Sequence, residues 1–217
     1  MIKSVKNILI EYKSFFYLYV LFLVLLGFVL ITYSKEETFW FVNSHFSPGA
    51  DVFFKGLTTL GDGIFFALIT LILALYRYRW ALLGLIIFIT SAGIAQILKH
   101  AFFDEILRPL GYFGSKVNLH TVEGVTLHVN NSFPSGHTTT AFALAVFLLF
   151  VFKLHKNGWI MTIIAILVGY SRVYLAVHFP IDVYFGSLIG VITAVIMFAW
   201  LEESLEKKFG EKGLLAK

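Results

Sequence analysis

Six long apolar segments limit what this chain can fold into. Of its 217 residues, 59% are hydrophobic and only 14% are charged, whereas about a quarter of the residues in a soluble domain are charged. A helix that crosses a bilayer needs about 20 apolar residues, with a tolerated range of roughly 17–25. Apolar segments suited to crossing occur at residues 15–33, 62–76, 80–98, 136–152, 158–175 and 181–200. The sequence therefore predicts an all-α, polytopic membrane protein with six transmembrane helices.

The first two segments differ from the others. The first is too long for the apolar part of a signal peptide, and no small-residue cleavage site follows it. We therefore expect it to be retained as a membrane anchor. The second is short for a crossing unless it takes in residues 57–60. No linker or low-complexity stretch is visible, so residues 1–217 are predicted to form a single integral membrane domain.

The positive charges favour one orientation of these segments. With the N-terminus inside, 11 of the 17 Lys and Arg residues fall in inner segments and 6 in outer segments. Because positively charged loops stay in the cytoplasm, both termini are expected there. The compact chain is expected in the inner membrane of a bacterium, with its outer face in the periplasm. The inner group comprises Lys3, Lys6, Lys13, Arg77, Arg79, Lys153, Lys156, Lys207, Lys208, Lys212 and Lys217, and the outer group comprises Lys35, Lys55, Lys99, Arg108, Lys116 and Arg172.

Composition excludes several classes of function. The net charge is +4, but no basic face interleaved with aromatic residues is present, so we expect no nucleic-acid partner. The chain has no cysteine, which excludes disulfides and thiolate metal sites. The expected partners are membrane lipids, and the sequence leaves the oligomeric state open.

Three short polar stretches interrupt the apolar segments. A charge at the bilayer centre costs about 2.5–3.5 kcal/mol on insertion scales, so charges at membrane depth usually serve a function. With six crossings, all three stretches lie at the outer ends of the third to sixth segments. Together they supply three cations, two imidazoles and one carboxylate. The stretches are Lys99 with Arg108-Pro109, Pro134-Ser135-Gly136-His137, and Ser171-Arg172 with His178 and Asp182.

The middle stretch has the features of a helix start that binds an anion. Ser135 is a natural N-cap, which places Gly136 and His137 in the first turn of the following helix. The free N–H groups at a helix N-terminus bind phosphate, and glycine allows close approach. His137 would then stand beside the anion, where it can act as an acid. The structural alternative is an ordinary cap with a histidine in the membrane interface.

The last stretch has the features of an activated histidine. His178 and Asp182 are four residues apart, and Pro180 between them places the helix start near Ile181. Asp182 then lies in the first turn, where negative charge is favoured, and its carboxylate can reach one ring nitrogen of His178. The other nitrogen is left unprotonated and able to attack. The structural alternative is an interfacial ion pair.

The first stretch requires a break in its helix. Lys99 and Arg108 are nine residues apart, which on a continuous helix turns them to opposite sides. For both to reach one phosphate, the helix has to break near residues 103–105. Pro109 favours an extended backbone at Arg108. The structural alternative is that Lys99 only extends to the lipid head groups.

Two other features of the sequence carry weaker predictions. Residues 111–131 form a long polar segment that can either contact a substrate head group or remain a surface loop. Its His120, Glu123 and His128 do not follow a standard metal-ligand spacing, so no metal is expected. Small residues predict close helix packing and no chemistry of their own. These are Gly186, Ser187 and Gly190 in the last segment, and Ser91, Ala92, Gly93 and Ala95 in the third.

Taken in order, the three stretches resemble the type-2 phosphatidic acid phosphatases, which are membrane lipid phosphate phosphatases related in fold to the vanadium haloperoxidases. The Pro-Ser-Gly-His stretch matches that family fully, as does Ser-Arg followed by five residues, His, three residues and Asp. The first stretch departs from it, because eight residues separate Lys99 from Arg108 where the family has six. The resemblance covers residues 99–200.

The resemblance implies a role for each site residue. His178 would be the nucleophile that forms a phosphohistidine, Asp182 would orient it, and His137 would protonate the leaving oxygen. The family needs no metal or other cofactor. Because His178 must be neutral and His137 protonated, a bell-shaped pH dependence of kcat/KM is expected. The phosphate oxygens would be held by Lys99, Arg108, Ser135, Gly136 and Arg172.

The expected activity is hydrolysis of a lipid phosphomonoester or pyrophosphate at the periplasmic face. Polyprenyl pyrophosphates such as undecaprenyl pyrophosphate, phosphatidate and phosphatidylglycerol phosphate are the preferred substrates. A lipid A phosphatase or a lipid phosphotransferase with the same site is the alternative. A transporter or a non-catalytic lipid binder is less favoured, because the charges cluster at one face and no inverted repeat is visible.

Overall fold

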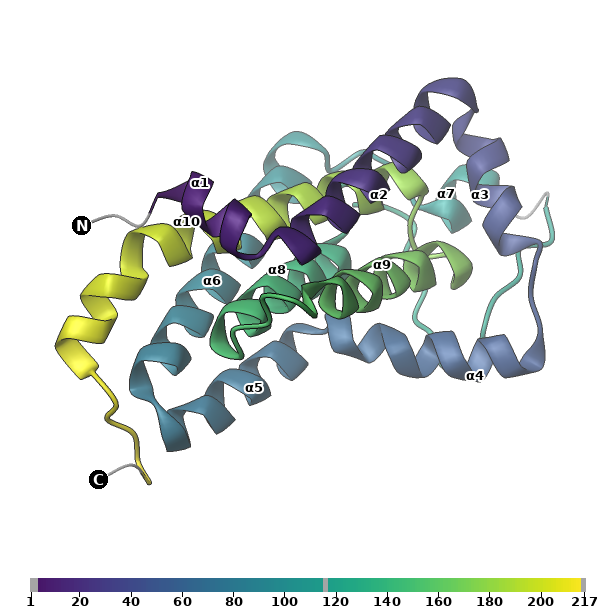
Figure 1. Cartoon of the computed structure of the whole chain (residues 1–217). Coiled ribbons are helices and arrows are strands. Elements are labelled where there is room, and N and C mark those ends of the chain that lie inside the picture. Colours follow the sequence, from purple (N-terminus) through teal and green to yellow (C-terminus); the bar gives the residue numbers. More distant parts are fainter. Residues whose placement is uncertain (1–3, 115–116, 216–217) are drawn as a thin grey trace.

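The computed structural model of the chain describes residues 4–114 and 117–215 (Figure 1). Within these residues the fold is all-helical and contains no strand, which confirms the all-α part of the predicted fold class. Lys3, Lys116 and Lys217, which entered the charge count, lie outside the described residues.

Helices occupy all six of the predicted segments, and shorter helices join them. The elements are α1 (Val5–Glu11), α2 (Lys13–Thr32), α3 (Lys35–Asn43), α4 (Pro48–Leu57), the 3-10 turn η1 (Thr58–Gly61), α5 (Gly63–Tyr76), α6 (Tyr78–Ile97), the π-turn η2 (Leu98–Phe102), α7 (Pro109–Phe113), α8 (Gly136–Val151), α9 (Gly158–Tyr174) and α10 (Pro180–Phe209).

The number of helices that meet the criteria for a crossing is smaller than six. Among the described residues, three helices are long and apolar enough to span a membrane: Lys13–Thr32, Tyr78–Phe102 and Pro180–Phe209. A fourth span results if Pro48–Gly61 and Gly63–Tyr76, which are bent by 56°, count as one. Helices α8 and α9 are apolar but shorter. The chain is therefore an all-helical membrane protein with three or four apolar spans, and six crossings stay a prediction.

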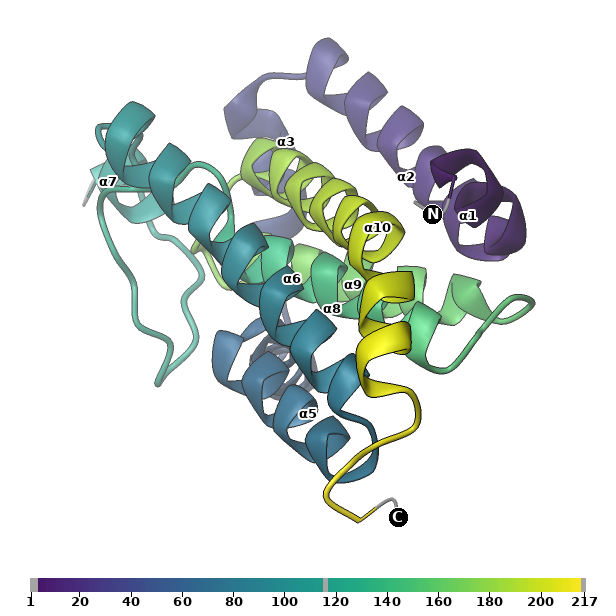
Figure 2. The same cartoon turned by 90° about the vertical axis from the view of Figure 1, so that its left-hand side faces the viewer.

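Helix α8 forms the centre of the molecule, with α6, α9 and α10 packed around it (Figures 1 and 2). Most of its residues are buried, as expected for a helix that is apolar on all sides. Its Phe150 ring stacks on Phe198 of α10, with the ring centroids 3.9 Å apart. Helix α5 packs on α6, whereas α2 lies against α9 and α10 on the other side. The ends of α8, α9 and α10 are therefore fixed against one another.

Glycines in α10 allow this close packing, as the sequence predicts. A Cβ atom at Gly190 would lie 2.4 Å from the Thr139 carbonyl oxygen, and one at Gly186 would lie 2.7 Å from the Ser135 carbonyl oxygen. The expectation for Gly93 of α6 was wrong, because a Cβ atom there would meet no described atom within 4 Å.

The long segment after α7 is tied to the rest of the fold at several points. Asn43 of α3 donates to the His120 carbonyl oxygen at 3.0 Å, and the His120 N–H donates to Asn43 at 3.1 Å. The His120 ring pairs with Asp51 of α4 at 2.8 Å. At the end of the segment, the Arg108 N–H donates to the Val129 carbonyl oxygen at 2.8 Å. These contacts hold the segment over α3 and α4.

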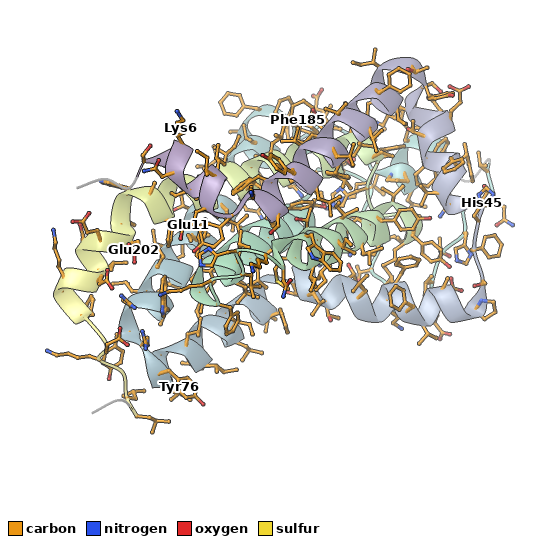
Figure 3. All side chains as sticks on the ribbon, in the orientation of Figure 1. Lys6, Glu11, His45, Tyr76, Phe185 and Glu202 are labelled. Atoms are coloured by element: carbon orange, nitrogen blue, oxygen red, sulfur yellow. The ribbon has the colours of Figure 1, made fainter. Side chains whose placement is uncertain are left out.

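The two ends of the molecule carry different parts of the chain. Lys6, Glu11, Tyr76 and Glu202 gather at the end near the two termini, and His45 projects from the opposite end (Figure 3). The connections α3–α4, η2–α7 and α9–α10 lie toward the end that carries His45 (Figure 1). The starts and ends of distant helices therefore meet far from the termini.

Candidate active site

One cavity of about 650 Å³ brings together six of the eight predicted site residues. They come from the π-turn η2, the residue before α7, the first turn of α8, the last turn of α9 and the segment before α10. All three polar stretches thus reach the same cavity. The six residues are Lys99, Arg108, Gly136, His137, Arg172 and His178.

His178 lines this cavity, and Asp182 lies behind it. The His178 Nδ1 atom is 3.2 Å from the Asp182 Oδ2 atom, and both side chains are buried, with 2% and 1% of their surface exposed. Asp182 is in the first turn of α10, as predicted, and the helix begins at Pro180, one residue before the predicted start. Its Oδ2 atom also accepts from the Phe179 N–H at 2.9 Å. With a proton on Nδ1, the Nε2 atom of His178 carries the lone pair.

The Ser135 side chain caps the N-terminus of α8, as predicted. The Ser135 hydroxyl oxygen accepts from the Thr138 N–H at 3.4 Å and from the Thr138 hydroxyl at 2.9 Å. Ser135 is fully buried, and the residues that line the cavity here are Gly136 and His137. The Ser135 hydroxyl therefore shapes the helix start, and its direct contact with phosphate stays a prediction.

The break expected between Lys99 and Arg108 is present. Helix α6 ends in the π-turn Leu98–Phe102, and Phe103 leaves the helical conformation at φ −133° and ψ 31°. Arg108 has the extended backbone expected before a proline, at φ −76° and ψ 167°. The eight-residue interval therefore allows both cations to reach one cavity.

The two arginines of the cavity differ in how many of their N–H donors find an acceptor in the protein. Arg108 donates through Nε to the Asn130 carbonyl oxygen at 3.0 Å and through Nη1 to the Val177 carbonyl oxygen at 3.4 Å. Burial lowers the pKa of Arg108 below its ordinary value, and the nearby Asp182 carboxylate opposes this effect. Arg172 donates to the Thr58 hydroxyl at 2.6 Å. Its buried Nε atom finds no hydrogen-bond partner among the described residues, so a donor is left for an anion.

Sequence reasoning missed the contribution of η1 and the bend that follows it. Thr58, Thr59 and Asp62 line the cavity, although the sequence indicates here only the start of the short second apolar segment. Asp62 caps α5 by accepting from the Ile64 N–H at 3.0 Å. A Cβ atom at Gly61 would lie 2.8 Å from the His137 carbonyl oxygen. The glycine next to Asp62 was the one signal that this turn packs tightly against another element.

The long polar segment contributes one wall of the cavity. Gly124, Val125, Thr126 and His128 line it, together with Lys55 of α4. Lys55 donates to the Glu123 carbonyl oxygen at 2.6 Å, which holds α4 to this wall. Part of the segment therefore borders the candidate cavity, and its contact with a substrate head group stays a prediction. Its His120 is elsewhere, paired with Asp51, and the described residues contain no group of three or more His, Cys, Asp or Glu residues placed to hold a metal ion.

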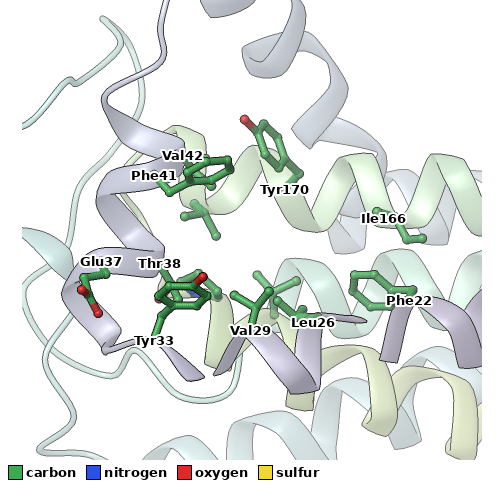
Figure 4. A pocket seen from close by; sticks show the side chains of 13 residues that line it. Phe22, Leu26, Val29, Tyr33, Glu37, Thr38, Phe41, Val42, Ile166 and Tyr170 are labelled. Atoms are coloured by element: carbon green, nitrogen blue, oxygen red, sulfur yellow. The ribbon is translucent and has the colours of Figure 1, made fainter. Parts of the chain in front are cut away.

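A second cavity of about 660 Å³ is mainly apolar and lies between α2, α3, α9 and the start of α10 (Figure 4). Tyr33, Glu37 and Thr38 form its polar end. The remaining lining residues are Phe22, Leu26, Val29, Phe41, Val42, Ile166, Tyr170, Val173, Pro180 and Val183. It contains none of the predicted site residues.

Comparison with known proteins identifies relatives of this chain. A model described as the PAP2 superfamily matches residues 77–206. The undecaprenyl-diphosphatase BcrC of Bacillus subtilis is 31% identical over 58% of this chain and 68% of its own length. Phosphatidylglycerophosphatase B of the same organism is 32% identical over 76% of this chain and 81% of its own length.

A third relative matches over a shorter stretch. The bacitracin transport permease protein BcrC of Bacillus licheniformis is 44% identical over 32% of this chain, which spans only 34% of that relative's length.

Two solved structures resemble the fold. The crystal structure of Aquifex aeolicus LpxE superposes with a TM-score of 0.64 at 30% identity, covering 79% of this chain and 99% of that one. The first transmembrane PAP2-type phosphatidylglycerolphosphate phosphatase from Bacillus subtilis gives a TM-score of 0.61 at 28% identity, covering 91% of this chain and 97% of that one. These matches confirm the expected family of membrane lipid phosphatases. The chain belongs to the PAP2 superfamily.

Proposed function

We propose that this chain hydrolyses a phosphomonoester or pyrophosphate of a lipid through a phosphohistidine at His178. The substrate group comprises polyprenyl pyrophosphates such as undecaprenyl pyrophosphate, and the glycerolipids phosphatidate and phosphatidylglycerol phosphate. Relatives named as an undecaprenyl-diphosphatase and a phosphatidylglycerophosphatase support both parts of this group. A lipid A phosphate is the alternative substrate, supported by relatives named as lipid A 4'-phosphatases.

The proposed reaction has two steps. The Nε2 atom of His178 attacks phosphorus, the bond from phosphorus to the lipid-side oxygen breaks, and His137 gives that oxygen a proton. Water then attacks the phosphohistidine, His137 takes up a proton from it, and phosphate leaves with the nitrogen–phosphorus bond broken. Asp182 accepts from Nδ1 of His178, which stabilises the positive charge that the ring gains during attack. His137 therefore acts as the general acid in the first step and as the general base in the second.

Charge stabilisation in this reaction comes from three buried or half-buried cations. Lys99 and Arg172 are each 7% exposed, so their fields act through little water. Together with Arg108 and the Gly136 N–H they would hold the phosphate oxygens. A fixed set of donors around the transferring group lowers the free energy of the transition state most when charge shifts onto those oxygens. No metal is required for these steps.

The observation that carries the proposal is the single cavity shared by both histidines and all three cations. His137 lies in the first turn of α8 and His178 in the segment before α10, 41 positions further along the chain (178 − 137). A purely structural use of these residues would not bring every cation to one cavity, because like charges repel at close range.

We place the chain in the inner membrane of a bacterium as one integral domain with six crossings. The N- and C-terminal regions lie at the same end of the molecule, and the site elements lie at the other (Figure 1). Lys and Arg residues are more frequent in the segments on the side of the two termini. Because positively charged segments stay in the cytoplasm, this arrangement supports cytoplasmic termini and a periplasmic site.

The test is a substrate panel with the purified full-length chain, the His178→Ala variant and a matched control. His45→Ala is the control, because His45 is exposed and its ring, among the described residues, forms hydrogen bonds with Ser44 and the Phe41 carbonyl oxygen, both outside the cavity. Release of inorganic phosphate from undecaprenyl pyrophosphate, phosphatidylglycerol phosphate and lipid A is measured for each protein. We expect the His45 variant to match the unmodified chain and the His178 variant to release none.

Three outcomes would change the proposal. Phosphate release that persists in His178→Ala would remove His178 as the nucleophile. Transfer of label to an acceptor lipid in place of water would make the chain a phosphotransferase. Binding of the lipid with no release by the unmodified chain would favour a transporter or a lipid binder.

A further inference from the structure

Ser132 is a buried residue whose hydroxyl reaches the proposed catalytic pair. It lies two positions before Pro134, and no part of the side chain or backbone is exposed. Its Oγ atom donates to the Asp182 Oδ2 atom at 2.5 Å. Nothing in the spacing of the three polar stretches pointed to this serine.

The Asp182 Oδ2 atom is the acceptor for three donors. They are the Ser132 hydroxyl at 2.5 Å, the Phe179 N–H at 2.9 Å and the His178 Nδ1 atom at 3.2 Å. The Ser132 contact is the shortest of the three. Hydrogen bonds to a carboxylate favour its ionised form and fix its direction. Ser132 and the Phe179 backbone therefore hold one oxygen of Asp182 in line with the ring of His178.

The position of Ser132 is itself fixed by backbone pairing. Its N–H donates to the Ile106 carbonyl oxygen at 2.9 Å, and the Arg108 N–H donates to the Val129 carbonyl oxygen at 2.8 Å. The segments 106–108 and 129–132 thus run side by side. The carbonyl oxygen of Asn130 in the second segment also accepts from the Arg108 side chain. One short segment therefore links a phosphate-binding cation to the residue that orients the nucleophile.

We propose that Ser132 is a positioning residue that keeps Asp182 aligned on Nδ1 of His178, so that Nε2 carries the attacking lone pair. This inference rests on the proposed function, since it assigns Ser132 a part in the same reaction. The carboxylate keeps the proton on Nδ1 and neutralises the ring as it is phosphorylated. Without the serine hydroxyl, Oδ2 loses its shortest hydrogen bond and the carboxylate is free to turn from the ring.

The experiment compares Ser132→Ala and Ser132→Thr with the unmodified chain. Threonine keeps the hydroxyl, and alanine removes it. For Ser132→Ala we expect kcat to fall about 10–100-fold, the range found when a group that orients a functional histidine is removed. KM should change little, because Ser132 does not line the cavity. The acid limb of the kcat/KM profile should move to lower pH, because a carboxylate that turns from the ring stabilises protonated His178 less. Ser132→Thr should recover much of the lost rate.

Two controls separate positioning from a general loss of structure. Ser91→Ala removes another fully buried serine hydroxyl, which donates to the Phe88 carbonyl oxygen within its own helix, and its activity should be unchanged. Inhibition by orthovanadate, a phosphate analogue, should persist in Ser132→Ala if the cavity is still folded. In a background of Asp182→Ala, the further change Ser132→Ala should have no additional effect, because Ser132 acts through that carboxylate.

Three results would overturn the inference. They are a Ser132→Ala variant with unchanged kcat and pH profile, an equal further loss in the Asp182→Ala background, and loss of vanadate inhibition together with activity. A separate result tests the proposed function itself: phosphate release by His178→Ala would show that it is wrong. If that variant is inactive and Ser132→Ala is fully active, only the role of Ser132 is wrong.

Discussion

At the scale of single residues, the site combines groups whose spacing could be predicted with groups whose place depends on the whole fold. His178 lies four positions before Asp182, which is in the first turn of α10, so their contact follows from local geometry. Ser135 could be predicted as a cap for the same reason. Thr58, Asp62 and Ser132 reach the site only because distant elements pack together. Their residue types are common in turns, so apart from the glycine next to Asp62 the sequence held no signal for them.

Arg172 offers a test of phosphate binding. Its Nε atom is buried and finds no partner among the described residues, and lysine has no atom that can donate from this position. A hydrogen bond to a charged group contributes about 1.5–3 kcal/mol, so Arg172→Lys should weaken vanadate binding by roughly 10–150-fold. The inhibition constant of vanadate measures this change. Arg77→Lys is the matched control, because Arg77 pairs with Glu211 outside the cavity, and equal affinities in both variants would contradict the assigned role.

The two histidines predict the pH dependence of the reaction. Protonation of His178 removes the attacking lone pair, so kcat/KM should fall toward acid pH. Deprotonation of His137 removes the proton for the leaving oxygen, so kcat/KM should also fall toward alkaline pH. Measurement between about pH 5 and pH 9 should therefore give a bell-shaped curve. A flat profile over this range would argue against the opposite roles of the two residues.

At the scale of helices, the site depends on how α8 and α10 fit together. The first turn of each helix carries part of the site, and the Ser135 N–H donates to the Asp182 carbonyl oxygen at 3.1 Å. The apolar segments predicted α8 and the start of α10 closely, whereas α10 continues nine residues beyond the predicted end, from 200 to Phe209. Their contact could be predicted only in part, because small residues indicate close packing without naming the partner helix. Gly93 shows the limit of that signal, since it faces open space in the described structure.

Gly190 and Gly93 form a matched pair for testing helix packing. A Cβ atom at Gly190 would lie 2.4 Å from the Thr139 carbonyl oxygen and 2.9 Å from the Ala143 nitrogen, both in α8. Because these backbone atoms cannot move aside cheaply, Gly190→Ala should destabilise the fold by about 1–3 kcal/mol. Gly93→Ala should keep or slightly raise the melting temperature, because alanine favours the helix. Thermal unfolding in detergent measures both, and equal melting temperatures would contradict the packing described here.

At the scale of the whole molecule, the two termini lie at one end and the candidate site lies toward the other (Figure 1). The segments at 80–98 and 181–200 were predicted as spans and fall within spanning helices, and the segment at 15–33 matches the spanning helix Lys13–Thr32 except at its last residue. The other three predicted crossings are helices, but α8 and α9 are shorter. Apolar composition alone therefore predicts helices better than it predicts crossings, because a buried central helix has the same composition as a spanning one.

The absence of cysteine from the sequence makes the topology testable. Single cysteines are introduced at His45 and at Lys156, which are both exposed and lie in connections that the six-crossing arrangement places on opposite sides. In intact cells, a maleimide that does not cross membranes should label His45→Cys and leave Lys156→Cys unlabelled. Permeabilised cells should allow labelling of both. Labelling of both variants, or of Lys156→Cys alone, in intact cells would contradict the proposed orientation.

The most direct test of the account is to identify the residue that receives the phosphoryl group. The full-length chain is mixed with lipid pyrophosphate labelled at the terminal phosphate, quenched in alkali within the first turnover, and digested for mass spectrometry. The account predicts a phosphorylated peptide with the modification on His178, and no such peptide from His178→Ala. Labelled phosphate released during turnover with no phosphohistidine at His178, or a modification on His137, would contradict it.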